Sequence, residues 1–339
     1  MRNSSIAPVE LICPAGSLPS LKAAVDNGAD AVYLGFRNAT NARNFPGLNF
    51  DDAEVRSAIH YAHERGKRVF LAVNTYPRPT EWDVACQAVD RAASLQVDAL
   101  IIADTGLMHY AASTHPGLRL HLSVQSSSTN HEAISFYARH FGIQRVILPR
   151  VLSLSQVRNI IRRVNVQVEV FGFGSLCVMV EGRCALSSYV TGDSPNISGV
   201  CSPAHAVRWE EDGSSRRSRL NGVLIDVYTP DKAAGYPTLC KGRFNVGGRI
   251  SYALEEPTSL NVLGILGPLV KAGVAAIKVE GRQRSPAYVA RVTSVLRAAL
   301  DACQSHPDDF APTQQWLAQL DNVAEGRCHT LGAYHRPWQ

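Results

Sequence analysis

Short apolar runs recur about every 25–35 residues along the first half of the chain, and a helical pattern follows each run. The runs lack a clean alternation of apolar and polar residues, which is typical of strands buried on both faces of a parallel sheet. A repeated strand-then-helix unit therefore predicts a parallel α/β architecture. The seven runs are ELIC (10–13), AVYLGF (31–36), KRVFLAVNT (67–75), DALIIAD (98–104), RLHLSVQSS (119–127), RVILPR (145–150) and QVEVFGF (167–173).

An eighth strand is predicted at AAIKVEG (275–281). A helix is expected before it over 258–273, and a long helix is expected after it over 285–303. Eight strand–helix units predict a closed TIM-like (β/α)8 barrel. An open, doubly wound sheet is the alternative, but no GxGxxG motif follows any early strand of the sequence.

The predicted barrel runs from residue 9 to residue 303 and is interrupted once. An insertion over 175–257 separates the seventh strand from its helix, and its turn-rich pieces and short β-like runs predict a small β-containing excursion. The residues after the last long helix, 304–339, are rich in Pro, His and Gln and are predicted to form an appendage. The insertion also holds the most informative cysteines.

Composition limits the classes of partner. Of the 339 residues 19% are charged, the net charge is +5, and the basic residues are scattered rather than clustered. This distribution does not indicate a nucleic-acid-binding surface. The first residues lack the apolar core of a signal peptide, and no apolar run reaches the ~18 residues of a membrane-spanning helix. We therefore expect a cytoplasmic protein whose cysteines stay reduced.

Four of the eight cysteines lie in the insertion with the spacing C-x6-C-x16-C-x38-C. They are Cys177, Cys184, Cys201 and Cys240. Four thiolates suit either zinc or an iron–sulfur cluster. Structural zinc sites usually contain closely spaced C-x2-4-C pairs, which are missing from this sequence, so the wide spacing favours a cluster. The remaining alternative is four unrelated buried thiols, because cysteine is often buried.

Polar and charged residues stand where several predicted strands end. In a TIM-like barrel these ends meet at one mouth, where the active site forms. Several arginines at one mouth predict an anionic ligand, since a guanidinium binds carboxylates and phosphates with paired hydrogen bonds. An internal Glu–Arg salt bridge and ordinary surface charges are the alternatives. The candidate binding residues are Arg43, Asn74, Gln125, Arg150, Glu280 and Arg282.

Five segments carry a resemblance to a known family. The cysteine-bearing segments are FGFGSLCVMVEGRCALSSYVTG, PNISGVC and LCKGRF, and the other two are IKVEGRQRSPAYV and the opening ELICPAGSLPSLKAAVDNGADAVYLG. Together they resemble the collagenase-like family historically called unclassified peptidases, over about residues 10–303. The segments LEEPTSLN and KVEGRQRSPAYV look most like the members that act in oxygen-independent ubiquinone biosynthesis.

The resemblance implies a function beyond what the spacing predicts. It implies a 4Fe–4S cluster on Cys177, Cys184, Cys201 and Cys240, and a hydroxylation that takes its oxygen from prephenate. It also implies a UbiV-like subunit as heterodimer partner and a UbiT-like lipid carrier. One departure is the stretch CSPAHAVR, where many relatives have a further cysteine soon after the third.

Three other functions stay open on the sequence. The first is a tRNA-hydroxylating relative, which shares the barrel and the cluster but should show a basic stripe. The second is a non-catalytic, cluster-bearing scaffold for a partner. The third is a peptidase, although the sequence contains no Ser–His–Asp pattern, Walker loop or HExxH motif that would indicate a hydrolase.

Overall fold

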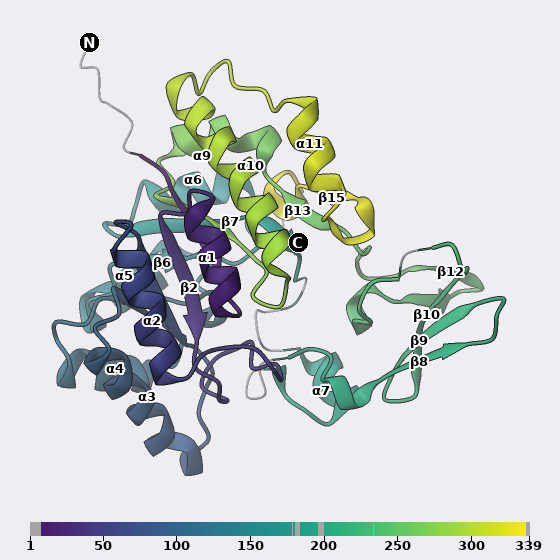
Figure 1. Ribbon diagram of the computed structural model, residues 1–339, viewed down its shortest axis with the longest axis horizontal. Coiled ribbons are helices and arrows are strands. Elements are labelled where there is room, and N and C mark those ends of the chain that lie inside the picture. Colours follow the sequence, from purple (N-terminus) through teal and green to yellow (C-terminus); the bar gives the residue numbers. More distant parts are fainter. Residues whose placement is uncertain (1–7, 178, 180–183, 196–199, 233, 337–339) are drawn as a thin grey trace.

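A computed structural model describes residues 8–177, 179, 184–195, 200–232 and 234–336. Its centre is a closed barrel of eight parallel strands (Figure 1). The last strand closes the barrel by pairing with both the first and the seventh, so that Ala276 lies beside Glu10 on one side and Glu169 on the other. The predicted TIM-like (β/α)8 barrel is thus confirmed. The strands are β1 (Glu10–Pro14), β2 (Ala31–Gly35), β3 (Arg68–Val73), β4 (Ala99–Ile102), β5 (Leu120–Leu122), β6 (Arg145–Ile147), β7 (Gln167–Ser175) and β14 (Ala276–Val279).

Helices cover the outside of the barrel (Figure 1). Most of them begin at a Ser, Asp or Asn whose side chain accepts a hydrogen bond from the first turn, as the free N–H groups of a helix start require. Asp51, for example, forms a capping box with Glu54. The helices are α1 (Leu18–Asp26), α2 (Asp52–His63), α3 (Trp82–Ser94), α4 (Thr105–Thr114), α5 (His131–Phe141), α6 (Leu154–Ile161), α9 (Leu266–Ala272) and α10 (Pro286–Ser305). Within the described ranges, no helix is long and apolar enough to cross a bilayer.

The helix expected over 258–273 is only partly present. Its first residues form strand β13 (Ser259–Asn261), and the helix α9 begins at Leu266. The reason is that β7 continues past the barrel rim and offers a free edge, with which β13 pairs antiparallel. Backbone pairing with a neighbouring strand overrides the weak local preference for a helix.

The insertion follows β7 and projects from the barrel, on the right of Figure 1. Its described residues include the short helix α7 (Ala185–Thr191), a three-stranded antiparallel sheet and a two-stranded hairpin. A small core of Ala206, Leu220 and Ile225 holds the sheet together. The elements are α7 (Ala185–Thr191), β8 (Val207–Glu211), β9 (Arg216–Leu220), β10 (Val223–Tyr228), β11 (Arg243–Val246) and β12 (Arg249–Tyr252).

The C-terminal residues pack onto the barrel. The helix α11 (Gln314–Asp321) buries Leu320 in the main core, and β15 (His329–Thr330) pairs parallel with β13. The hydroxyl of Tyr334 donates a hydrogen bond to the backbone oxygen of Phe171 in β7, at 2.9 Å. The segment that the sequence predicts only as an appendage therefore adds a strand to the sheet beside β13.

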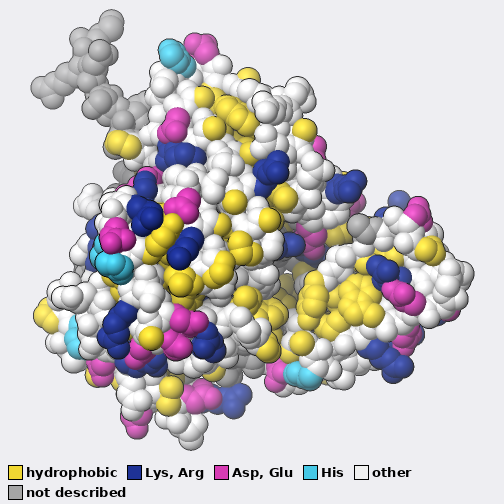
Figure 2. Space-filling view, viewed as in Figure 1, with side chains coloured by type: hydrophobic (Ala, Val, Ile, Leu, Met, Phe, Trp, Pro, Cys, Tyr) yellow, Lys and Arg dark blue, Asp and Glu magenta, His cyan; other side chains and the backbone are white. Residues whose placement is uncertain are grey.

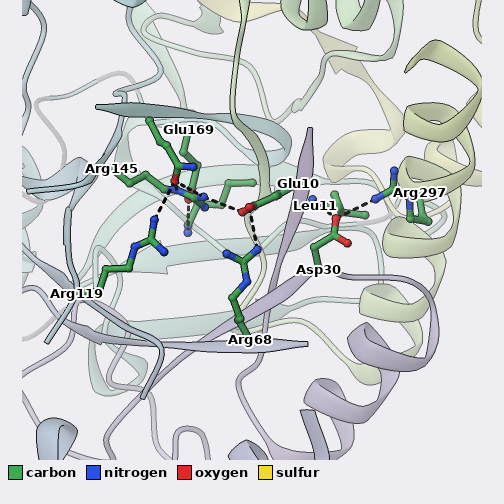
Figure 3. Close-up of polar contacts among 10 residues, drawn as sticks. Glu10, Leu11, Asp30, Arg68, Arg119, Arg145, Glu169 and Arg297 are labelled. Carbon is green, nitrogen blue, oxygen red and sulfur yellow. Dashed lines mark hydrogen bonds and ion pairs between the residues drawn. The ribbon is translucent and has the colours of Figure 1, made fainter. Parts of the chain in front are cut away.

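Side chains of alternating charge fill the lower half of the barrel, the half away from the carboxyl ends of its strands (Figure 3). Arg145 is fully buried and donates to Glu10 at 2.7 Å and to Glu169 at 3.2 Å. Glu10 also pairs with Arg68 at 2.9 Å, and Glu169 pairs with Lys278 at 2.7 Å. Burial opposes the ionisation of Glu10, but Arg145 and Arg68 outweigh it and hold the pKa of Glu10 below its usual value. Each buried charge in this chain of five thus has an opposite neighbour.

Glu169→Gln removes the shared acceptor of two buried cations. We expect it to lower the free energy of unfolding by about 3–5 kcal/mol, because Arg145 and Lys278 keep their charges without full compensation. Urea denaturation measures the change. The matched control is Asp308→Asn, which breaks the exposed pair with Lys271 and should cost about 0–1 kcal/mol. Equal costs for the two variants would contradict the structural importance of the buried chain.

Candidate functional site

A cavity opens at the mouth of the barrel, where the carboxyl ends of the strands meet. All six binding residues predicted from the sequence line it: Arg43, Asn74, Gln125, Arg150, Glu280 and Arg282. Other lining residues were not predicted, notably Tyr33, Ser123, Phe171 and Lys278. The structure therefore brings together side chains that are far apart in the sequence, in the place expected for the active site of such a barrel.

Lys278 could have been found from the sequence. Lys278, Glu280 and Arg282 alternate along the motif IKVEGR, and successive odd or even positions of a strand point to the same face. Lys278 is buried, with its Nζ 3.9 Å from the centre of the Tyr33 ring. Burial lowers the pKa of Lys278, and the ion pair with Glu169 below it partly offsets that effect.

Arg282 is the most unusual side chain of the cavity. It is 4% exposed, and its Nη1 is buried without a hydrogen-bond partner. Among the residues that the structure describes, no carboxylate lies within ion-pair distance of it. Burial lowers the pKa of Arg282 from its usual value to about 10, because the cation loses water without gaining a close counter-ion. A buried, uncompensated guanidinium indicates a site for an anion.

Two glycines make room for Arg282. A Cβ on Gly16 would lie 1.8 Å from the backbone oxygen of Arg282, and a Cβ on Gly35 would lie 2.6 Å from its Nη1. Real Cβ atoms do not approach other atoms so closely, so any larger residue at either position displaces the arginine. Gly16 in PAGS and Gly35 in YLGF thus allow Arg282, which follows the last barrel strand, to pack closely against the first two strands.

Glu280 does not neutralise Arg282. The Glu280 carboxylate accepts a hydrogen bond from the backbone N–H of Ser175 at 3.2 Å, and no ion pair joins it to Arg282 in the described residues. Burial opposes ionisation of Glu280, but the positive charges of Arg43, Arg284 and Arg150 outweigh it and keep its pKa below the usual value. Glu280 is therefore an anion at neutral pH. Its charge is stabilised by the arginines around the cavity and by the backbone N–H of Ser175, rather than by an ion pair with Arg282.

The remaining predicted residues shape the wall. Arg43 donates from Nη1 to the oxygen of Ala42 at 2.8 Å, and Arg150 lies over the ring of Phe171, with 4.4 Å between the guanidinium carbon and the ring centre. Asn74 donates to the hydroxyl of Ser123 at 3.1 Å. Gln125 is buried at the start of the loop after β5.

The described lining of the cavity is rich in positive charge. Among the lining residues that the structure describes, four are cations, Arg43, Arg150, Lys278 and Arg282, and one is a carboxylate, Glu280. Glu169, beneath the cavity, neutralises Lys278. The described lining of the cavity is therefore mainly positive, which is suited to an anionic ligand.

The four predicted cluster cysteines are half-buried thiols at the start and on the inner side of the insertion. Burial raises the pKa of the Cys240 thiol to about 12; Lys241 opposes this, and the nearby thiols of Cys201 and Cys184 add to it. Three of the four thiols are thus close enough to influence one another. Cys177 follows the end of β7 by two residues, and its Sγ lies 3.8 Å from the oxygen of Met179.

Four thiols are the donor set that an iron–sulfur cluster takes, with one thiolate per iron. In the described ranges, no group of three His, Cys, Asp or Glu side chains is close enough to hold a metal ion. Buried neighbouring thiolates also need a compensating cation, which iron supplies. Residues 181–183 of the motif EGRC lie outside the described residues.

Comparison with known proteins assigns the family. The model of peptidase family U32 matches residues 16–337. The tRNA hydroxylation protein P of Escherichia coli (strain K12) is 32% identical over 341 residues, covering 94% of this chain and 72% of that protein. A tRNA hydroxylation protein of Bacillus subtilis (strain 168) is 28% identical over 315 residues, covering 93% and 68%. A collagenase of Porphyromonas gingivalis is 29% identical over 325 residues, covering 93% and 70%. Because the family match spans nearly the whole chain, this protein belongs to peptidase family U32.

Proposed function

We propose that this chain is the iron–sulfur subunit of an oxygen-independent hydroxylase that acts in ubiquinone biosynthesis. The observation that carries the proposal is the buried Arg282, with its unpartnered Nη1, in a cavity lined mainly by cations. The names of two relatives, both tRNA hydroxylation proteins, support hydroxylation as the reaction class. The likeness of LEEPTSLN and KVEGRQRSPAYV to the family members that act in oxygen-independent ubiquinone biosynthesis supports that pathway and a UbiV-like partner subunit.

Prephenate fits the cavity as hydroxyl donor because it carries two carboxylates. Arg282 and Arg150 would each bind one carboxylate through a paired, charge-assisted contact, which orients the donor as well as binding it. Arg43 adds positive charge at the outer edge. The apolar side chains of Ile101, Ile147 and Phe171 line the same cavity and suit the carbon ring of the donor.

Cys177, Cys184, Cys201 and Cys240 would hold a 4Fe–4S cluster, which supplies one-electron chemistry when bound. The backbone N–H of Ser187 donates to the Cys184 sulfur at 3.3 Å. The tail of a lipid-linked substrate would reach this subunit on a UbiT-like carrier.

Hydroxylation of tRNA is the second candidate, favoured by the names of the two relatives. The charges of the insertion speak against it. Arg216, Arg217 and Arg219 of β9 each pair with an acidic side chain of β8 or the turn that follows it. On the face seen in Figure 2, Lys and Arg side chains are interspersed with Asp and Glu. A surface without excess positive charge attracts RNA weakly.

The cluster is tested by metal content. Protein purified without oxygen should be brown and contain about four irons per chain, as expected for four thiolates around a cluster. Alanine at Cys177, Cys184, Cys201 or Cys240 should each lose iron. Alanine at Cys86 or Cys303, which are buried in the barrel core, should keep it. Stoichiometric zinc, or full iron in two or more of the first four variants, would refute the ligand assignment.

The anion site is tested by calorimetry on the anaerobic complex. Arg282→Ala and Arg150→Ala should each weaken prephenate binding by at least about tenfold, because a charge-assisted contact contributes about 1.5–3 kcal/mol. Lysine at either position should restore binding poorly, since it lacks the paired geometry. The control is Arg249→Ala, on the exposed hairpin of the insertion. Wild-type affinity in both alanine variants, with iron intact, would place the donor site elsewhere.

The molecule that receives the hydroxyl group can be identified in cells that lack this protein. After growth without oxygen, mass spectrometry should find an accumulated, under-hydroxylated ubiquinone precursor and unchanged hydroxylation of tRNA. The Arg282→Ala variant should fail to restore the quinone, whereas Arg249→Ala should restore it. Loss of a tRNA hydroxyl group with normal quinone would favour the second candidate instead.

A further inference from the structure

Ser175, the last residue of β7, is bonded to both sides of the molecule. Its backbone N–H donates to the Glu280 carboxylate at 3.2 Å, and its backbone oxygen accepts from Nη1 of Arg150. These two partners line the mouth cavity. Its hydroxyl donates to Glu325 at 3.2 Å and accepts from Nζ of Lys241 at 3.1 Å. One residue thus contacts the cavity through its backbone and a second group of charges through its side chain.

That second group is a buried ion pair between Lys241 and Glu325, whose side chains are 5% and 12% exposed. Lys241 belongs to the turn Leu239–Lys241, which also contains Cys240. Glu325 belongs to the C-terminal segment, and its backbone N–H donates to the hydroxyl of Ser259 in β13 at 2.9 Å. Taking two charges out of water is unfavourable unless their contacts are well formed, so the pair constrains the position of both segments.

The end of β7 can transmit a displacement. Gly174 has φ +122°, and a Cβ there would lie 2.8 Å from the backbone oxygen of Glu280. The chain therefore passes directly against the cavity residue, without an intervening side chain. A shift of Ser175 moves the hydrogen-bond partners of Glu280 and Arg150 together with those of Lys241 and Glu325.

We infer that Glu325 is a positioning residue that couples occupation of the anion cavity to the seating of the Cys240 turn. The inference rests on the proposed function, because it takes prephenate as the anion and Cys240 as a cluster ligand. Binding of the anion fixes the positions of Arg150 and Glu280. Because Ser175 is hydrogen-bonded to both of them and to Lys241 and Glu325, its position and that of the ion pair become fixed as well. Since such coupling is reciprocal, a bound anion should also hold the cluster more firmly.

The experiment measures iron release to a chelator from the anaerobic complex, with and without saturating prephenate. In the wild type, prephenate should slow release about fivefold or more, the lower end of typical coupling between sites. In Glu325→Gln the slowing should disappear, although prephenate still binds and iron is present at the start. Asp321→Asn, an exposed carboxylate of the same segment beside His329, is the control and should keep the wild-type ratio.

The ratio separates positioning from simple destabilisation. A loosened insertion would lose iron faster both with and without prephenate, which leaves the ratio unchanged. Ser175→Ala removes only the hydroxyl between the two groups and should also abolish the slowing, so it decides the matter if Glu325→Gln does not fold. A wild-type ratio in either folded variant, or no slowing in a wild type that binds both iron and prephenate, overturns the inference. A wild type without iron or without prephenate binding overturns the proposed function instead.

Discussion

The closure of the barrel by β14 is the contact on which the rest depends. This strand pairs with β1, from the start of the chain, and with β7, which is separated from it by the whole insertion. Because all eight strands are parallel, closure puts every carboxyl end at one mouth. It also aligns Lys278, Glu280 and Arg282 with residues of the second, third and sixth strands. Without closure, the arginines that line the cavity would belong to separate surfaces.

Buried charges are paired differently at the two ends of the barrel. At the lower end, Glu10, Arg145 and Glu169 alternate in sign, so each of these three charges has an opposite partner (Figure 3). At the mouth, Arg282 is equally buried but has no such partner among the described residues. Buried charges that alternate in sign stabilise one another and so maintain the fold. A buried charge without a partner lowers the stability of the protein but increases its affinity for a ligand of opposite charge. The contrast within one barrel argues against a role of Arg282 in packing alone.

The barrel and the composition of its mouth could be predicted from the sequence because both follow from short patterns. Apolar runs identify strands, and residues just after them must lie at the mouth. The helix predicted over 258–273 was wrong at its start. Residues 259–261 pair with the extended β7, and this tertiary contact cannot be predicted from the local sequence. The Lys241–Glu325 pair could not be predicted at all. Its members are 84 residues apart, and it exists only because the C-terminal segment docks beside β13.

The order of the strands at the rim has a consequence for synthesis on the ribosome. β7 is made first, β13 can pair with it only after the whole insertion has emerged, and β15 can join only after the last barrel strand, β14, has been made. Domains generally fold as their residues emerge, so the cysteine-bearing insertion spends much of its synthesis without its final neighbour. Glu325, the counter-charge of Lys241, is made after all eight strands of the barrel. The turn that carries Cys240 can therefore take its final position only after the barrel strands have been synthesised.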